Sequence, residues 1–361
     1  RGERPYLEEW SRIVQRDRNH PAIIGWCPFN ETPKEAGPLQ DSTFAITKIL
    51  DPTRPVIDTS GYIHSLQFPE VMDAHDYDQN PVTFAARWKN LVTGADLPAR
   101  YASSIPAIPF FLSEYGGIGW DTGSGWGYGS NPKTEEEFFA RLKGLTEALT
   151  SNPGMFGFCY TQLTDVEQER NGIFTYDRRP KFDLKKFKAI FGLPAAIEKN
   201  QQGVSKPSYN WSVLLGANVD GSDAAVWKYT FDVQPEGWEK NANTSSWKTG
   251  KGGFGSKSGF ESLIKTEWTT KDIYMQTEVD YDGSDFKNGT LVIHYDNAAT
   301  VYVNGNVIWK ANSGAWNDNY DGFEVTQALK KALKKGKNVV SVHCHQDTGG
   351  QFIDLALILG R

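Results

Sequence analysis

The sequence predicts an α/β region followed by an all-β region within 361 residues. In residues 1–195, short apolar runs alternate with segments of helical spacing, which is the order that an α/β barrel requires. In residues 216–361, stretches with alternating apolar residues are separated by turn residues, as in an antiparallel β-sandwich. Residues 196–215 are polar and carry glycine and proline, so we expect a linker there. The predicted fold class is therefore α/β plus all-β.

The chain reaches its first candidate catalytic acid at Glu31. A predicted helix with one apolar face leads toward it, and that face is formed by Leu7, Trp10, Ile13 and Val14. The apolar run of residues 22–29 then predicts a parallel strand buried on both faces, and Asn30 and Glu31 leave its carboxyl end. Because the carboxyl ends of barrel strands carry the chemistry, we expect Glu31 to be catalytic rather than structural.

A second apolar run ends in the same way at Glu114. Residues 109–112 are apolar, and Glu114 lies two positions after them. A turn on Gly116 and Gly117 then follows. Two carboxylates at two strand ends point to one shared site, because the carboxyl ends of parallel strands meet at the same edge of a sheet.

The remaining elements complete an alternating series. Helices are expected at residues 42–50, 84–91, 135–149 and 182–191, and further strands at residues 55–61, 71–79 and 157–163. These parallel strands make up only the second half of a barrel, which would leave unpaired edges and an open core. We therefore expect this chain to be the carboxyl-terminal portion of a longer enzyme.

Two stretches resemble the catalytic strands of glycoside hydrolase family 2, which contains β-galactosidases, β-glucuronidases and β-mannosidases. Residues 16–31 resemble the segment that ends barrel strand 4 in an Asn-Glu pair, and Glu114-Tyr115-Gly116 resembles the end of strand 7. The resemblance implies the second half of a (β/α)8 TIM barrel, with Glu31 as the acid/base and Glu114 as the nucleophile. A retaining mechanism would need these two carboxyl groups about 5 to 5.5 Å apart.

The resemblance also implies roles for residues that bind the sugar. Asn30 is expected to hydrogen-bond the sugar 2-hydroxyl, or else to cap the strand end. Tyr77 stands where the family often has a tyrosine that steadies the nucleophile. His75 and Asp76 beside it are candidates to bind sugar hydroxyls, with packing at a strand end as the alternative.

Aromatic residues supply the other candidates. Tyr160 stands near the place where the family commonly has a tryptophan platform, which departs from the family pattern. Trp120 and Trp126 lie in a loop rich in glycine and tryptophan, where they either stack on a sugar face or pack the loop.

The predicted activity is that of a retaining β-glycosidase acting on terminal non-reducing sugars, most like a β-galactosidase. β-Glucosidase and β-mannosidase are near rivals. β-Glucuronidase ranks lower, because residues 169–174 lack the Asn-x-Lys pair that grips a substrate carboxylate in glucuronidases. The rival from another class is a catalytically incompetent fragment that acts as a glycan-binding or scaffold protein.

The all-β region resembles the galactose-binding-like jelly rolls appended to many bacterial glycosidases, and the chain from Trp211 onward contains seven of the twelve tryptophans. A third hypothesis is that this region alone binds carbohydrate. His343 and His345 alternate on one predicted strand, but two imidazoles do not make a metal site. We expect no metal and no required cofactor, with Mg²⁺ or Na⁺ allowed only by family resemblance.

Composition excludes other classes of function. The net charge is −6 without a basic cluster, so nucleic acid is not an expected partner. No apolar run reaches the roughly 18 residues of a membrane span. The three cysteines, Cys27, Cys159 and Cys344, are expected to be buried free thiols. Members of the family usually act on polysaccharides, so the resemblance suggests a periplasmic or secreted bacterial protein with a carbohydrate substrate. A homo-oligomeric state is compatible with this expectation.

Overall fold

The structure is a computed structural model that describes residues 3–61, 63–66, 69–91, 108–120, 123–199, 211–219, 224–256, 262–317 and 319–361. The chain divides into two units. The β unit comprises Arg1–Pro28, Glu35–Asp58 and Tyr209–Arg361, and the α/β unit comprises Phe29–Lys34 and Thr59–Ser208. Each unit combines segments that are far apart in the sequence, so the units are not the same as the predicted domains. The domains at residues 1–195 and 216–361 stay a prediction. Part of the predicted linker, residues 200–210, lies outside the described residues.

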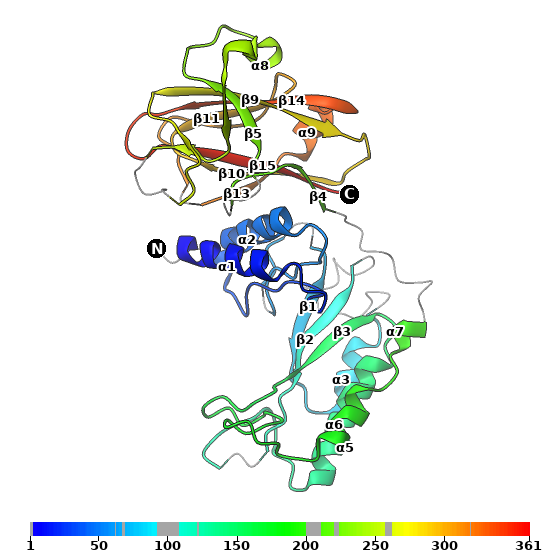
Figure 1. Ribbon diagram of the computed structural model, residues 1–361. Helices are drawn as coiled ribbons and strands as arrows, with labels where there is room; N and C mark the ends of the chain where they lie inside the picture. The colour runs from blue at the N-terminus through cyan, green and yellow to red at the C-terminus, as the bar shows by residue number, and fades with distance from the viewer. Residues whose placement is uncertain are drawn as a thin grey trace. The chain divides into compact units, whose positions relative to one another are not determined.

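The α/β unit is built on a parallel sheet of three strands in the order β1-β2-β3 (Figure 1). These strands are β1 (Met72–Asp76), β2 (Phe110–Gly116) and β3 (Met155–Thr161). The helices of this unit are α3 (Pro81–Trp88), α5 (Glu135–Thr150), α6 (Leu184–Phe191) and α7 (Ala196–Lys199). Figure 1 shows α3, α5 and α6 together on one side of the sheet. The predicted alternation of strands and helices is confirmed from residue 72 onward.

The helices α3 and α5 begin at side-chain caps. The Asn80 side chain accepts a hydrogen bond from the Val82 N–H at 2.9 Å, and Pro81 suits the first turn of α3. Thr134 accepts from the Glu137 N–H at 3.2 Å, and three glutamates occupy the first turn of α5. Negative charge there is favourable, because unpaired N–H groups leave a helix N-terminus partially positive. The helix predicted at residues 135–149 agrees with α5, whereas the helix predicted at residues 84–91 begins earlier, at Pro81, because Asn80 caps it there.

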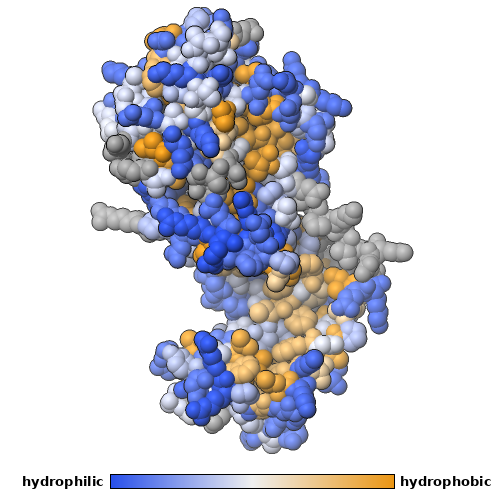
Figure 2. Space-filling model, in the orientation of Figure 1, coloured by the Kyte–Doolittle hydropathy of each residue, from blue (hydrophilic) through white to orange (hydrophobic). Residues whose placement is uncertain are grey.

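Apolar residues of the sheet and the helices form one core. It is assembled from Phe84, Trp88, Phe110, Leu112, Tyr115, Phe138, Leu142 and Leu145, among others. The outer edge is different: Phe156 is 46% and Leu163 is 65% exposed, and Figure 2 shows apolar surface on the visible face of this unit. Within the described residues, β1 and β3 each pair with a neighbouring strand on one side only. The described part of the chain therefore contains an open sheet, not a closed barrel.

Residues 22–29 do not form the regular strand that the sequence predicts. This run forms only isolated parallel bridges, between Trp26 and Val56 and between Asn30 and Ser60, and the predicted strand at residues 55–61 is reduced to the same bridges. Burial on both faces is also wrong, since Ile24 is 80% exposed. The reason is that the described chain supplies a paired segment on one side of this run only. An apolar run is buried only where another layer covers it.

In the part of the chain that the structure describes, the β unit has two six-stranded sheets, with pairings that are antiparallel except between β7 and β8. One sheet has the order β13-β10-β15-β7-β8 with β4 on β15, and the other has the order β12-β11-β14-β9-β5-β6. The strands are β4 (Trp211–Leu215), β5 (Val226–Thr230), β6 (Lys248–Lys251), β7 (Phe254–Gly255), β8 (Thr266–Glu267), β9 (Asp272–Tyr281), β10 (Asn288–Tyr295), β11 (Ala298–Val303), β12 (Asn306–Ala311), β13 (Asp321–Glu324), β14 (Gly336–His345) and β15 (Phe352–Gly360). The strands predicted from the alternation of apolar residues in this part of the chain are confirmed.

Both sheets contribute to a single hydrophobic core. Its fully buried members include Trp227, Ile273, Met275, Leu291, Val301, Val342 and Leu357. Two short helices, α8 (Trp238–Asn241) and α9 (Thr326–Ala332), lie in connections between strands. This unit is held by side chains that alternate toward the core from each sheet.

Two long helices belong to the β unit as well. They are α1 (Glu3–Asp17) and α2 (Gly37–Leu50), which lie side by side in Figure 1. α2 packs on the sheet that contains β4 and β13: the Phe44 ring meets Trp211 edge to face at 5.4 Å, and the Ser42 hydroxyl donates to Asp321 at 3.3 Å. No helix in the described residues is long and apolar enough for a transmembrane span.

The cysteine prediction is confirmed in part. All three thiols are free, and Cys344 is buried in the β unit. Burial is wrong for Cys27 and Cys159, which are exposed. Cys159 lies on β3, whose outer side is open within the described residues, and Cys27 lies in the exposed run described above.

Candidate active site

Glu31 is held by backbone pairing at one edge of the α/β unit. Its N–H donates to the Ser60 carbonyl at 2.8 Å, and the Ser60 N–H donates to the Phe29 carbonyl at 2.8 Å. The φ angle of Glu31 is 51°, in the left-handed region that few non-glycine residues adopt. Such a conformation costs of order 1 kcal/mol and persists only where surrounding contacts impose it. It aims a side chain that is 37% exposed toward the end of the parallel sheet.

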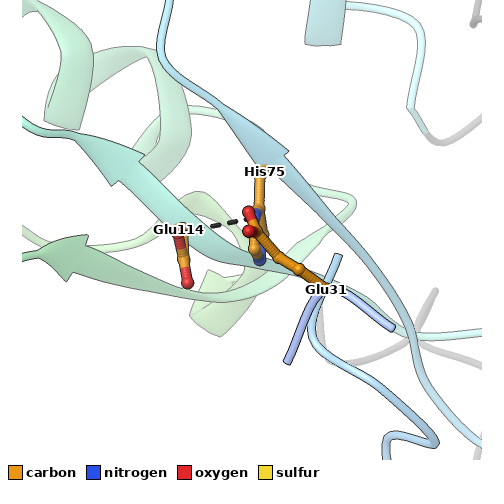
Figure 3. Close-up of side chains that lie close together, drawn as sticks. All are labelled: Glu31, His75 and Glu114. Atoms are coloured by element: carbon orange, nitrogen blue, oxygen red, sulfur yellow. Dashed lines mark hydrogen bonds and ion pairs between the residues drawn. The ribbon is translucent and has the colours of Figure 1, made fainter. Parts of the chain in front are cut away.

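Glu114 on β2 is the register partner of His75 on β1. His75 Nδ1 lies 2.9 Å from Glu31 Oε1 and 3.4 Å from Glu114 Oε2 (Figure 3). One oxygen of each glutamate and one nitrogen of His75 all lie within 4.8 Å of one another. The structure thus brings together the two acids that the sequence singled out, 83 residues apart, and places an imidazole between them.

Tyr77 completes the surroundings of Glu114. Its hydroxyl donates a hydrogen bond to Glu114 Oε2, and its ring stacks on Tyr128 with centroids 3.6 Å apart and an interplanar angle of 3°. Burial and the Glu114 carboxylate raise the pKa of Tyr77, so the phenol keeps its proton and remains a donor. The two rings fix the direction of that donor.

The charge of Glu114 is set by opposing effects. Burial raises the pKa of Glu114 above its ordinary value, and the negative charge of Glu31 acts in the same direction. The hydrogen bond from Tyr77 lowers that pKa, and a positive charge on His75 would lower it as well. The net direction is upward, so this carboxylate is harder to ionise than an exposed glutamate.

Asp76 and Trp120 are not brought to this cluster. Both Asp76 oxygens are used toward α3: one accepts from Arg87, and the other accepts from Trp88 Nε1 at 2.8 Å. Trp120 packs edge to face on Phe138 at 6.0 Å, within the aromatic core. Substrate binding by Asp76 and Trp120 stays a prediction for which these contacts offer a structural alternative.

Asn30 and Tyr160 lie near the cluster without contacting its three side chains in the described geometry. Asn30 is exposed and precedes Glu31, so its predicted contact with a sugar hydroxyl stays a prediction. Tyr160 pairs in register with Tyr115 on β2, and its ring packs against Gly116, where a Cβ would lie 2.4 Å from it. Its hydroxyl is 3.5 Å from the Asn171 carbonyl.

Several residues of the site were missed by sequence reasoning. Ser60 and Ser113 connect the cluster to the buried Asp73, and Tyr128 stacks on Tyr77. A signal for the serines was available, because Ser60 ends a predicted strand and Ser113 directly precedes Glu114. Tyr128 offered no such signal, since it comes from an irregular loop.

The three clustered ligand atoms could also be reached by one cation. Two carboxylates and an imidazole are a plausible donor set, but the same spacing is what two glutamates of a retaining glycosidase need. The glutamate and the imidazole already satisfy each other by a 2.9 Å hydrogen bond. We assign no metal here, and the absence of a required cofactor stays a prediction.

Comparison with known proteins identifies the family. The model of the TIM barrel domain of glycosyl hydrolases family 2 matches residues 1–193, which is more than half of the chain. The chain belongs to glycosyl hydrolase family 2. The predicted family is thereby confirmed, and so is the predicted class of fold for the first part of the chain.

Relatives in family 2 differ in their named activities. "Beta-galactosidase 2" of Enterobacter cloacae is 25% identical over 257 residues, covering 64% of this chain and 24% of the relative. A β-glucuronidase of Rattus norvegicus is 46% identical over 56 residues, covering 15% and 9%. A β-galactosidase of Pectobacterium atrosepticum is 51% identical over 51 residues, covering 14% and 5%. The chain thus spans less than a quarter of the length of these relatives.

Solved structures of family 2 members are similar over shorter shares. A β-glucuronidase of family 2 matches with a TM-score of 0.27 and 16% identity, covering 37% of this chain and 17% of that chain. The β-glucuronidase from Ruminococcus gnavus in complex with uronic isofagomine matches with a TM-score of 0.30 and 14% identity, covering 43% and 29%. Similarity at this level supports no conclusion about specificity.

Proposed function

We propose that this chain supplies the catalytic pair of a retaining β-glycosidase, with Glu31 as the acid/base and Glu114 as the nucleophile. The observation that supports the proposal is the approach of their carboxylate oxygens to within 4.8 Å of each other. A retaining mechanism needs carboxyl groups about 5 to 5.5 Å apart, whereas an inverting mechanism needs about 6.5 to 9.5 Å to admit a water molecule. The separation therefore favours double displacement.

In the first step, the Glu114 carboxylate would attack the anomeric carbon while Glu31 gives its proton to the departing glycosidic oxygen. The bond from carbon to that oxygen breaks, and a covalent glycosyl ester forms on Glu114. In the second step, Glu31 would take a proton from water, and the resulting hydroxide displaces Glu114. Tyr77 steadies Glu114 through its hydroxyl throughout.

The finer assignments belong to the same proposal. We propose the second half of a TIM barrel followed by a jelly-roll sandwich, and a carbohydrate substrate with β-galactoside specificity first. β-Glucosides and β-mannosides are the rivals, with β-glucuronides less favoured because residues 169–174 lack the Asn-x-Lys pair. The β-galactosidase that aligns over 257 residues supports this order without deciding it. A periplasmic or secreted location and a homo-oligomeric state remain part of the proposal.

The deciding experiment is hydrolysis of a panel of aryl β-glycosides by the full-length protein and three variants. Glu114→Gln should lose on the order of 10⁴-fold or more in kcat. Glu31→Ala should keep activity only on dinitrophenyl glycosides, because an activated leaving group needs no proton. Glu198→Gln, which changes an exposed glutamate of α7, is the matched control and should behave as the unchanged protein.

The same panel addresses the rival hypothesis of a glycan-binding or scaffold protein. That hypothesis is favoured by one observation, the open three-stranded sheet within the described residues. Glycan binding without hydrolysis of any glycoside by the full-length protein would support the rival. Hydrolysis with normal rates by Glu114→Gln would end the assignment of the nucleophile.

A further inference from the structure

His75 contacts both proposed catalytic acids through one ring nitrogen. Its side chain is 6% exposed, and its Nδ1 lies 2.9 Å from Glu31 Oε1 and 3.4 Å from Glu114 Oε2 (Figure 3). The ring is wedged against the backbone at Gly61, where φ is 73° and an added Cβ would lie 2.5 Å from the imidazole. The ring has little room to turn, so the direction of Nδ1 is fixed.

The other ring nitrogen begins a chain of hydrogen bonds into the interior. His75 Nε2 lies 2.9 Å from Ser60 Oγ, and the Ser60 hydroxyl donates to Ser113 Oγ at 2.9 Å. The Ser113 hydroxyl donates to Asp73 Oδ2, which also accepts from the Gly61 N–H at 2.9 Å. Asp73 is completely buried. These residues come from two strands and the Ser60 segment, all within the α/β unit.

The chain fixes which nitrogen of His75 carries a proton. Both Asp73 oxygens face nitrogen atoms: Oδ2 accepts from the Gly61 N–H, and Oδ1 lies 2.8 Å from His64 Nε2. These neighbours suit a carboxylate, which can only accept, so Ser113 uses its single hydrogen on Asp73. Ser60 then uses its hydrogen on Ser113, and its oxygen must accept from His75. Nε2 therefore bears the hydrogen, and in the neutral ring Nδ1 presents a lone pair to Glu31.

We infer that His75 is a positioning residue that shares the acid/base proton of Glu31, and that the chain of Ser60, Ser113 and Asp73 holds it in the tautomer protonated on Nε2. This inference rests on the proposed function. Before the first step, Glu31 donates its carboxyl proton to Nδ1 in a hydrogen bond and remains a competent acid. When that proton leaves with the glycosidic oxygen, a lone pair faces a carboxylate. Their repulsion strengthens Glu31 as the base that deprotonates water.

Other ionisable groups face this arrangement. Glu114 lies on the Nδ1 side, and the Tyr77 ring meets the imidazole edge to face with centroids 6.4 Å apart. At the far end of the chain, His64 Nε2 lies 2.8 Å from Asp73 Oδ1. A positive charge on His64 would weaken Asp73 as the acceptor of the hydrogen bond from Ser113.

The test compares Ser60→Ala with Ser246→Ala, an exposed serine of the β unit that serves as the matched control. Both are measured in the full-length protein on two aryl glycosides with poor and good leaving groups. Without Ser60, His75 can place its hydrogen on Nδ1 and favour ionised Glu31. We expect kcat/KM to fall about 10-fold for the poor leaving group and less than about 2-fold for a dinitrophenyl leaving group. The basic limb of the pH profile should move to lower pH.

A second measurement does not depend on catalysis. Long-range ¹H–¹⁵N correlation spectra of the full-length protein distinguish the two imidazole tautomers, and the His75 signals are assigned by their loss in His75→Gln. Hydrogen on Nε2 supports the inference, and a neutral ring with hydrogen on Nδ1 overturns it, even if Ser60→Ala does not fold. Hydrolysis by Ser60→Ala with unchanged leaving-group and pH dependence also overturns it. Failure of the unchanged protein to hydrolyse any glycoside would overturn the proposed function, and the role of His75 in proton sharing with it.

Discussion

At the scale of single residues, the site depends on how each carboxylate is solvated and paired. Glu114 is buried enough for its pKa to rise, and the Tyr77 hydroxyl compensates by hydrogen-bonding the ionised form. A nucleophile must be ionised to attack, so this donor matters to the pH range of activity. Tyr77 in turn is held by its stack on Tyr128.

Replacement of Tyr77 by phenylalanine should separate these effects. The ring and its stack on Tyr128 would remain, while the donor to Glu114 is lost. The pKa of Glu114 should rise further, so the acidic limb of the kcat/KM profile should move to higher pH, and kcat should fall about 10²-fold. A pH profile of Tyr77→Phe in the full-length protein measures this. An acidic limb that stays in place or moves to lower pH would contradict the assigned role of the hydroxyl.

At the scale of elements, the alternation of side chains at the end of β1, from His75 to Tyr77 just beyond the strand, separates the catalytic cluster from packing. His75 and Tyr77 lie two positions apart and both reach the glutamates, while Asp76 between them reaches α3. The sequence grouped the three residues because they adjoin. The pleat of the strand assigns them to opposite sides.

Asp76→Asn should therefore act on stability. Asp76 is almost fully buried and accepts from Arg87 and Trp88, so loss of its charge should lower the free energy of unfolding by about 1–3 kcal/mol. Asp78→Asn is the control: Asp78 also pairs with Arg87, at 3.2 Å, but is more exposed, so its effect should be under about 1 kcal/mol. Urea unfolding measures both. A raised KM for Asp76→Asn with undiminished stability would instead favour the predicted contact with substrate.

At the scale of the whole molecule, two buried ionisable residues give the β unit opposing dependences on pH. His294 and Asp354 are register partners on β10 and β15. Burial lowers the pKa of His294 to about 3 and raises the pKa of Asp354 to about 6. The neutral histidine contributes stability that is present above about pH 6.5 and is lost as pH falls toward 3. The carboxyl contributes stability that is present below about pH 4 and is lost as pH rises through 6.

Asp354→Asn should separate the pH dependence of stability that comes from Asp354 from the one that comes from His294. The variant removes the stabilisation that Asp354 gains on protonation, so acidification from pH 7 to 4 should lower the free energy of unfolding more steeply than in the unchanged protein. Chemical unfolding of the full-length protein across this pH range provides the measurement. An equal or shallower slope would show that Asp354 does not take up a proton in the folded state.

The sequence by itself determined what depends on neighbours along the chain. The helical spacing of residues 135–149, the alternation of the β strands and the acids that end two apolar runs are local patterns, and each could be recognised without coordinates. The family followed from the same local motifs, because the residues around Glu31 and Glu114 are contiguous. The burial of side chains could be predicted less well from the sequence. The run at residues 22–29 is apolar but largely exposed, because burial requires a second layer of structure that the local sequence does not specify.

Only the tertiary structure decided which side chains meet. The contact of Glu31 with His75 spans 44 residues, that of Tyr77 with Glu114 spans 37, and that of Ser60 with Ser113 spans 53. Such contacts depend on strand register and on the pleat, where a shift of one residue turns every side chain to the other face. For this reason the sequence could propose His75 and Asp76 equally, and only the paired strands assigned one to the glutamates and the other to a helix.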